Sequence, residues 1–328
     1  MSCGMTQSIS RRWPLLAALT FVGAGLLTAA GPRAGATDAD APVPELIGEG
    51  VISTPDDELG GSTSADGQTL YFEKSAPPHY LYVMLESHLV NGRWGQPEML
   101  PFSGLHRDTA PVLTPDGRTL LFASDRPVNG VDKHHFYIWA ATRTEKGWNE
   151  PRLLDGPVNS GFDQVFASMA ANGNIYFTSS RKTGSYDIFR TRLENGQYQP
   201  EEELAELNGP GIASFEAFVS PDESYLLIGS FGREETVGSS DLYISYRQSG
   251  AWTKPKNLGP MINSPARDYS PRVSLDGKWM YFTSERLDHP LSFPLSVADF
   301  ERFSHGLYNG LGNLYRVPLD YVLRTTRP

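Results

Sequence analysis

The fold is indicated most clearly by one stretch of the sequence, Thr114-Pro115-Asp116-Gly117-Arg118-Thr119-Leu120-Leu121-Phe122-Ala123-Ser124-Asp125-Arg126. It joins a Pro-Asp-Gly turn to an apolar run, and a second short run, Asp108 to Leu113, precedes the turn. An Asp-Gly pair between two such runs is a strong short-range signal for a hairpin, because Gly supplies the positive φ that a two-residue turn needs. The stretch therefore predicts two antiparallel strands joined by a tight turn.

The same pattern occurs five times along the chain. The turns are Ala65-Asp66-Gly67, Pro115-Asp116-Gly117, Ala171-Asn172-Gly173, Pro221-Asp222-Glu223 and Leu275-Asp276-Gly277. Their Asp or Asn positions are 50, 56, 50 and 54 residues apart. A nearly fixed period of this size is typical of an array that repeats one supersecondary unit.

Each unit contains signals for four strands. The third strands include Tyr80 to Val83, Phe136 to Thr142, Asp187 to Phe189, Asp241 to Ile244 and Asn313 to Val317; the fourth begin near Trp94, Trp148, Tyr198 and Trp252. Four antiparallel strands repeated around an axis predict an all-β fold, a single β-propeller of five four-stranded blades over residues 44–328.

The ends of the chain indicate how the ring closes. The fifth unit stops after its third strand, and Pro44 to Ile52 precedes the first unit without a partner of its own. We expect this N-terminal segment to supply the fourth strand of the last blade, which would remove the free sheet edges.

The repeat resembles the WD40-like (PD40) repeat of periplasmic TolB-type propellers. The shared motifs are Ser/Thr-Pro-Asp-Gly, then Phe-x-Ser-x-Arg, then Asp-Ile/Leu-Tyr/Phe, with the best copies at 114–126, 179–189 and 274–286. The resemblance covers residues 44–320 and implies an exported propeller without the N-terminal domain of a full TolB. The first and fourth copies depart most, because Glu73-Lys74-Ser75 and 229–233 replace the Ser-x-Arg motif.

The N-terminus predicts export. Arg11-Arg12 precede 20 uncharged residues, Trp13 to Pro32, and Ala34-Gly35-Ala36 offers a cleavage site, so residues 1–36 are interpreted as a signal peptide, with an uncleaved membrane anchor as the alternative. Ser10-Arg11-Arg12 fits part of the twin-arginine export pattern, whereas Pro14 and Leu16 depart from it and favour the general secretory route. Residues 37–43 form a short polar tether. We expect a periplasmic or secreted protein without stable membrane insertion after cleavage.

Composition narrows the classes of partner. The formal charge is −10, and removing the three arginines of residues 1–36 makes it −13, which argues against binding of nucleic acid or anionic lipid. Cys3, the one cysteine, lies in the predicted signal peptide, so the exported chain has no disulfide, thiolate metal site or cysteine nucleophile. We expect a monomer that binds an envelope protein, a peptide or a glycan.

Several repeated residues are interpreted as structural. The Asp-Gly pairs shape the turns, and Trp94, Trp148 and Trp252 are expected to cover the outer edges of their blades. A third set is expected to bind carboxylates or carbonyls between blades, with Asp187 and Asp241 as carboxylate partners: Arg126, Arg181 and Arg286.

Candidate ligand-binding residues gather at one end of the predicted propeller. We call this end the loop face; it carries the connections from strand two to strand three and from strand four to the next blade. The opposite end, with the Asp-Gly turns, is the turn face. An acid lies seven to nine residues before four of the five turns, and these acids are expected to ring the mouth of the central channel: Glu58, Asp108, Asp163 and Asp268.

Histidines fall mainly on the loop face as well. His106, His134, His135 and His305 are candidate ligand-binding residues there, together with His79 and His289. Imidazole and carboxylate groups can bind a ligand, exchange protons or hold a divalent cation such as calcium, although no cofactor is required by any motif. A long insert, Leu287 to Gly312, also leaves this face, and its aromatic content leads us to expect that it packs over the channel mouth.

Two functions are compatible with these features. The first is a non-catalytic binding scaffold, because the chain has no Gly-x-Ser-x-Gly, His-Glu-x-x-His or phosphate-loop motif. The second is a glycan-active hydrolase or lyase that uses Asp108, Asp163 and Asp268, since two carboxylates suffice for glycoside hydrolysis.

Overall fold

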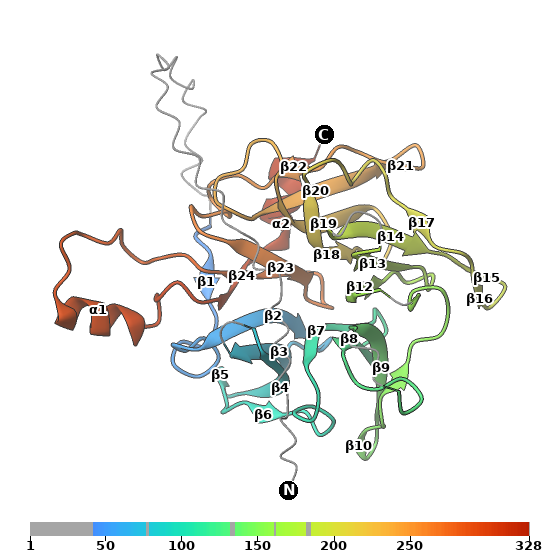
Figure 1. Ribbon diagram of the computed structural model, residues 1–328, viewed down its shortest axis with the longest axis horizontal. Helices are drawn as coiled ribbons and strands as arrows, with labels where there is room; N and C mark the ends of the chain where they lie inside the picture. Colours follow the sequence, from blue (N-terminus) through green and yellow to red (C-terminus); the bar gives the residue numbers. More distant parts are fainter. Residues whose placement is uncertain (1–41, 77–78, 132–134, 161, 182–184, 328) are drawn as a thin grey trace, which may run out of the picture. The chain divides into compact units, whose positions relative to one another are not determined.

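The computed structural model describes residues 42–76, 79–131, 135–160, 162–181 and 185–327. The predicted signal peptide and most of the predicted tether lie outside these residues. The described residues form one compact unit, in which five antiparallel sheets stand around a common axis (Figure 1). The prediction of a five-bladed, all-β propeller is confirmed.

The strands of each blade are named in order from the axis outward. Blade 1 contains β2 (Asp57–Thr63), β3 (Thr69–Ala76), β4 (Leu81–Val90), β5 (Arg93–Trp94) and β6 (Glu98–Met99). Blade 2 contains β7 (Asp108–Leu113), β8 (Thr119–Ser124), β9 (Tyr137–Thr144), β10 (Gly147–Trp148) and β11 (Arg152–Leu153). Blade 3 contains β12 (Gln164–Met169), β13 (Ile175–Ser179), β14 (Asp187–Thr191) and β17 (Glu202–Glu203), with the hairpin of β15 (Leu193–Glu194) and β16 (Gln197–Tyr198) beside it.

Blade 4 contains β18 (Ala213–Val219), β19 (Tyr225–Phe231), β20 (Asp241–Gln248), β21 (Ala251–Trp252) and β22 (Lys256–Asn257). Blade 5 contains β23 (Asp268–Val273), β24 (Trp279–Ser284), β25 (Asn313–Pro318) and β1 (Glu45–Leu46). The first strand of each blade contacts the first strands of both neighbouring blades, so these five strands surround the axis.

The two ends of the described chain meet in blade 5. Glu45 pairs with Arg316 and Leu46 with Tyr315, and the Ile47 amide donates to the Leu314 carbonyl at 2.9 Å. The expected closure by the N-terminal segment is therefore confirmed. It gives β25 a neighbour on each side, which leaves no open edge at the seam of the ring.

The Asp-Gly turns share one hydrogen-bond pattern in all five blades. In blade 2 the Arg118 amide donates to Asp116 Oδ1 at 3.0 Å, and the corresponding bonds to Asp66, Asn172, Asp222 and Asp276 span 3.0–3.1 Å. A short polar side chain that accepts from the backbone two residues later stabilises the turn locally. The turn of blade 4 keeps this bond but has Glu223, not Gly, at the positive φ of 55°.

Neighbouring blades pack through an aromatic pair on the turn-face side. Trp148 of blade 2 packs edge-on against Tyr71 of blade 1, and Trp252 of blade 4 packs in the same way against Tyr176 of blade 3, with ring centroids 5.6 and 5.8 Å apart. The tryptophans therefore fill the contacts between blades, where we expected them to cover the blades' outer edges.

Charged side chains from several blades are buried together near the axis. Arg272 of β23 is fully buried, and Glu73 of β3 and Glu216 of β18 act on it electrostatically. Glu73 accepts a hydrogen bond from the Ala110 amide of blade 2, and Glu216 accepts from the Ser270 hydroxyl of blade 5 at 3.1 Å. Burial raises the pKa of Glu73 to about 7, because the fold withdraws its carboxylate from water.

Two helices lie outside the repeat. Helix α2 (Leu319–Thr326) follows β25 and buries Leu319 and Val322 in the core that blades 4 and 5 share. Helix α1 (Val297–Ser304) begins at Ser296, whose hydroxyl and amide both bond Asp299 in a capping box, and it has no buried residue. Figure 1 draws α1 to the side of the ring of blades, away from the axis.

Candidate functional site at the loop face

Three of the four predicted ring acids are buried in ion pairs at the start of the first strands. Asp108 lies 2.6 Å from Arg126 Nη2, and Asp268 lies 3.1 Å from Arg286 Nη2. Glu58 lies 3.0 Å from Lys74 Nζ, and burial raises its pKa to about 7 despite that cation. Each pair joins the first two strands of one blade, because the acid and the cation lie at neighbouring ends of β-paired segments. These three carboxylates therefore have structural partners within their own blades.

The arginines of the Ser-x-Arg motif complete this arrangement. Arg126 and Arg286 each also donate to a carbonyl in the loop that enters the blade, Phe102 at 3.2 Å and Ile262 at 2.6 Å. Arg181 instead pairs with Glu201. Their carboxylate partners therefore lie within the same blade, whereas we expected contacts between blades. Asp241 accepts bonds from the Val237 and Gly238 amides and from Asn257.

Asp163 occupies a different position from the other ring acids. Strand pairing places Gln164 opposite Ser179, just as Asp108 is opposite Ser124, so Asp163 corresponds to Arg107. Its carboxylate accepts from the Phe136 amide at 2.9 Å and lies 3.4 Å from His135 Nδ1. The variable distance of seven to nine residues before the turn hid this one-residue offset in the sequence.

The candidate histidines do not converge on one point. His135 contacts Asp163, half-buried His106 lies in the loop before β7, and exposed His305 contacts the Glu301 carbonyl at the end of α1. His134 lies outside the described residues. Among the residues that the structure describes, no group of three or more His, Cys, Asp or Glu side chains could hold a metal ion. Calcium binding stays a prediction.

The insert between β24 and β25 does not cover the axis. Because α1 stands beside the ring, the expectation that Leu287 to Gly312 packs over a channel mouth is wrong (Figure 1). The insert is held at its base, where Asn309 Nδ2 donates to the Pro55 carbonyl at 2.8 Å and Tyr308 packs against the core. Its Phe293 and Phe300 side chains are 78% and 59% exposed.

Exposed apolar side chains are concentrated in loops of this face. Of the fifteen large hydrophobic side chains that are exposed among the described residues, three lie elsewhere: Val43, Val90 and Met99. The other twelve belong to loops that leave the loop face or begin the strand that follows: Tyr80, Leu81, Leu105, Val131, Phe162, Val237, Met261, Leu287, Leu291, Phe293, Val297 and Phe300. Such concentration on one side is typical of an interaction surface.

Aromatic side chains gather at the loop-face ends of the first, second and third strands. We call Tyr82, Phe136, Tyr186, Phe215, Phe231 and Tyr269 the aromatic belt. Phe215 contacts Tyr186 and Phe231 with ring centroids 5.3 and 4.9 Å apart, and Tyr82 contacts Phe136 at 6.5 Å. The belt draws on all five blades, and five of its six members are only partly buried.

Two arginines lie over this belt, each held by an acid. Arg107 stands 4.8 Å from the Phe136 ring and bonds Asp125 at 2.7 Å. Arg267 stands 4.8 Å from the Tyr269 ring and bonds Glu285 at 2.9 Å. The two pairs occupy equivalent positions in blades 2 and 5. In each pair the arginine directly precedes a buried acid, Asp108 or Asp268. All four side chains are partly exposed, so their charges are within reach of a partner.

The chemistry of the belt is suited to recognition. Burial raises the pKa of Tyr186 to about 12, and it raises the pKa of Tyr82 as well, so both phenols stay protonated near neutral pH. A protonated phenol can donate and accept hydrogen bonds but is not poised to remove a proton. Tyrosine and arginine at the centre of an apolar surface are the residues that most often dominate binding energy in protein interfaces.

Comparison with known proteins finds similarity only among solved structures. No family model matches the chain, and no curated protein matches its sequence. Among solved structures the chain is similar to TolB from Acinetobacter baumannii, with 18% identity and a TM-score of 0.47, covering 80% of this chain and 54% of that one. The chain thus spans about half the length of that TolB.

Two further solved structures are similar to this chain. One is a putative TolB from Agrobacterium tumefaciens, with 17% identity, 68% of this chain and 88% of that chain covered, and a TM-score of 0.37. The other is a gluconolactonase from Xanthomonas campestris, with 15% identity, 79% and 84% covered, and a TM-score of 0.43. The assignment of a propeller rests on the strand pairing, and membership of the PD40 family stays a prediction.

The sequence analysis missed the aromatic belt and the two ion pairs beside it, Arg107–Asp125 and Arg267–Glu285. Arg107-Asp108 with Ser124-Asp125-Arg126, and Arg267-Asp268 with Ser284-Glu285-Arg286, repeat the same arrangement of charges in two blades. That repeat was visible in the sequence. The belt was not, because its members come from three kinds of position in the blade and follow no common spacing.

Proposed function

We propose that the protein is an exported, non-catalytic binding propeller whose loop face docks a protein or peptide of the cell envelope. The observation that carries this proposal is the concentration of exposed apolar side chains in loops of that face. The aromatic belt and the two arginine–acid pairs supply the polar and aromatic contacts that such an interface uses at its centre.

Export is part of the proposal. It rests on the apolar N-terminal segment with its Arg11-Arg12 pair and small-residue cleavage site. In the part of the chain that the structure describes, helices are too short or too polar to span a bilayer. We propose a periplasmic or secreted location, with the propeller acting as a monomer.

Catalysis on glycans is the second hypothesis, and the structure offers it less support. Two of its three carboxylates, Asp108 and Asp268, are buried and bonded to arginines of their own blades. A general acid or a nucleophile must reach the bond it breaks, which a buried carboxylate in an ion pair does not. A glycan as the docked partner stays a prediction.

The proposal is tested by capture from envelope extract with three immobilised proteins. The wild type is compared with a loop-face variant, Leu105→Ser with Phe293→Ser, and with a matched control, Val90→Ser. All three substituted side chains are exposed, so each variant is expected to fold as the wild type does. A protein retained by the wild type and by Val90→Ser, and lost by the loop-face variant, supports the proposal.

Retention that is equal for all three proteins contradicts docking at the loop face. Capture of a glycan in place of a protein contradicts the proposed class of partner. Cleavage of an envelope polymer by the wild type, abolished by Asp163→Asn, would support the catalytic alternative.

A further inference from the structure

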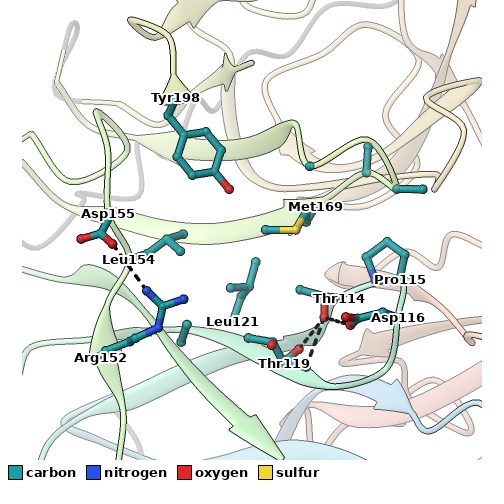
Figure 2. Close-up of a pocket in the computed structure, with 14 residues that line it drawn as sticks. Thr114, Pro115, Asp116, Thr119, Leu121, Arg152, Leu154, Asp155, Met169 and Tyr198 are labelled. Atoms are coloured by element: carbon teal, nitrogen blue, oxygen red, sulfur yellow. Dashed lines mark hydrogen bonds and ion pairs between the residues drawn. The ribbon is translucent and has the colours of Figure 1, made fainter. Parts of the chain in front are cut away.

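The packing between blades differs at the junction of blades 2 and 3, on the turn-face side. A cavity of about 310 Å³ opens there. Leu121, Ala140, Leu154 and Met169 line its wall, and Tyr198 and Arg152 face it from opposite sides (Figure 2). Pockets of this size hold small organic molecules.

Three side chains that line the cavity are smaller than their counterparts at the junction of blades 3 and 4. Strand pairing shows that Leu121 of β8 occupies the position of Tyr71, Tyr176 and Tyr281 in blades 1, 3 and 5. Blade 4 also has a leucine there, Leu227, which belongs to the core that Leu319 and Val322 of α2 complete. Ala140, opposite Leu121, occupies the position of Arg190 and Arg316. Tyr198 replaces the tryptophan that packs between the blades elsewhere.

The neighbouring junction shows what fills this space elsewhere. Between blades 3 and 4, Trp252 packs edge-on against Tyr176, whose hydroxyl donates to Glu223 at 2.7 Å. Arg190 lies over the Tyr176 ring at 5.9 Å, and Arg247 bonds Glu223 at 2.9 Å. Since the same backbone positions are filled by large and mutually bonded side chains there, the space beside Leu121 results from side-chain size.

The lining that the structure describes contains one cation, Arg152, which lies near Asp155. The Arg152 side chain makes one polar contact among the described residues, with Asp155 Oδ2 at 3.5 Å, and the Asp155 side chain is itself almost fully exposed. A guanidinium offers five N–H donors and binds a carboxylate through two of them. Arg152 therefore retains most of its donors for a ligand.

Asp116, in the turn beside the cavity, already accepts two hydrogen bonds within its own turn. Asp116 Oδ1 accepts from the Thr114 hydroxyl at 2.6 Å and from the Arg118 amide at 3.0 Å, and these bonds lower the pKa of Asp116. The inner wall is aliphatic, so the hydroxyl groups of a sugar would lose their hydrogen bonds to water without gaining partners. A flat or branched hydrocarbon would fit beside Leu121, Met169 and Tyr198.

We propose that the junction between blades 2 and 3 binds a small carboxylate with an apolar body. Its hydrocarbon part lies between Leu121, Met169 and Tyr198, and its carboxylate meets the Arg152 guanidinium at the rim. The site is independent of the loop-face partner, because it opens on the other end of the propeller.

Isothermal titration of phenylacetate into the full protein tests this site, with phenylacetamide as the uncharged probe. Arg152→Gln removes the cation, and Leu121→Tyr restores the residue that blades 1, 3 and 5 carry. Arg93→Gln is the matched control, since Arg93 is an exposed arginine in β5 of blade 1, away from the cavity. We expect a dissociation constant of about 1 mM or below for phenylacetate.

Arg152→Gln is expected to weaken phenylacetate binding at least about tenfold, Leu121→Tyr to abolish it, and Arg93→Gln to leave it unchanged. Ala140→Leu is the second filling variant, should Leu121→Tyr fail to fold. The proposal is overturned by absence of heat with the wild type up to about 10 mM, by equal affinity for phenylacetamide, or by unchanged binding in Arg152→Gln and the filling variants.

Discussion

The turn face and the loop face are built from the same five blades, but they follow different rules. At the turn face one Asp or Asn accepts the same backbone bond in every blade, within 3.0–3.1 Å. At the loop face the connection from strand two to strand three ranges from a few residues in blade 1 to the insert that carries α1. The repeated end supplies stability, and we propose that the variable end supplies recognition.

The largest expected effect belongs to the contacts between blades. Trp252→Ala removes a buried ring from the junction of blades 3 and 4 and is expected to lower the free energy of unfolding by about 3–5 kcal/mol. Tyr198→Ala, at the same position beside the cavity, is expected to cost less than half as much, because Tyr198 is only partly buried. Chemical denaturation measures both, and equal losses would contradict the account of an underpacked junction.

The sequence predicted the fold in some detail, because turns and strand periodicity are local signals. Asp116-Gly117 and its four counterparts placed the blades, and the unpartnered segment at Pro44 predicted the closure. The two helices were missed, although Ser296-x-x-Asp299 is a capping signal and 319, 322, 323 and 326 follow a helical spacing.

The candidate site was predicted less well, because charge pairing depends on contacts between strands. Asp108 and Asp268 looked like free acids in the sequence, yet strand pairing sets each beside an arginine 18 residues later. The cavity beside Leu121 could be found only by aligning the blades through their strand register, since it arises from side chains that are smaller than their counterparts.

The next largest expected effect is a pH dependence of the free energy of unfolding, which comes from Glu73 between the two faces. Burial raises the pKa of Glu73 to about 7, so the folded state binds this proton more tightly than the unfolded state does. The stabilisation is fully present below pH 4.5 and is lost as the pH rises through 7, by roughly 3 kcal/mol. Arg272 and Asp57 are the charged groups that act on Glu73.

Glu73→Gln is expected to flatten this dependence, because the amide oxygen can still accept from the Ala110 amide and carries no proton equilibrium. Thermal melting of both proteins between pH 5 and pH 8 measures it. A wild type and a variant with parallel profiles would show that Glu73 is ionised throughout, and the assignment would be wrong.

A smaller effect is expected at the turns. Asp276→Ala removes the acceptor of the Ser274 hydroxyl and of the Lys278 amide, and is expected to cost about 1 kcal/mol of unfolding free energy. Asp288→Ala, at the loop face, loses only an exposed contact with His289 and is expected to change stability by less than about 0.5 kcal/mol. Urea denaturation compares them, and a larger loss for Asp288→Ala would reverse the roles assigned to the two faces.

The smallest effect on stability is expected for the apolar residues of the insert. Phe300→Ser removes a mostly exposed ring from α1, which has no buried residue, and is expected to change the melting temperature very little. Differential scanning calorimetry measures it. A substantial drop in melting temperature would mean that the insert packs against the propeller, and its exposed rings would then not be available for docking.

The most direct test of the proposed docking face is photo-cross-linking in the cell. A benzophenone amino acid placed at Leu105, which is 86% exposed on the loop face, is compared with one at Val90, which is 61% exposed on the turn face. Docking at the loop face predicts a discrete cross-linked protein from position 105 and none from position 90. A cross-link from position 90 alone, or none from either position, would contradict it.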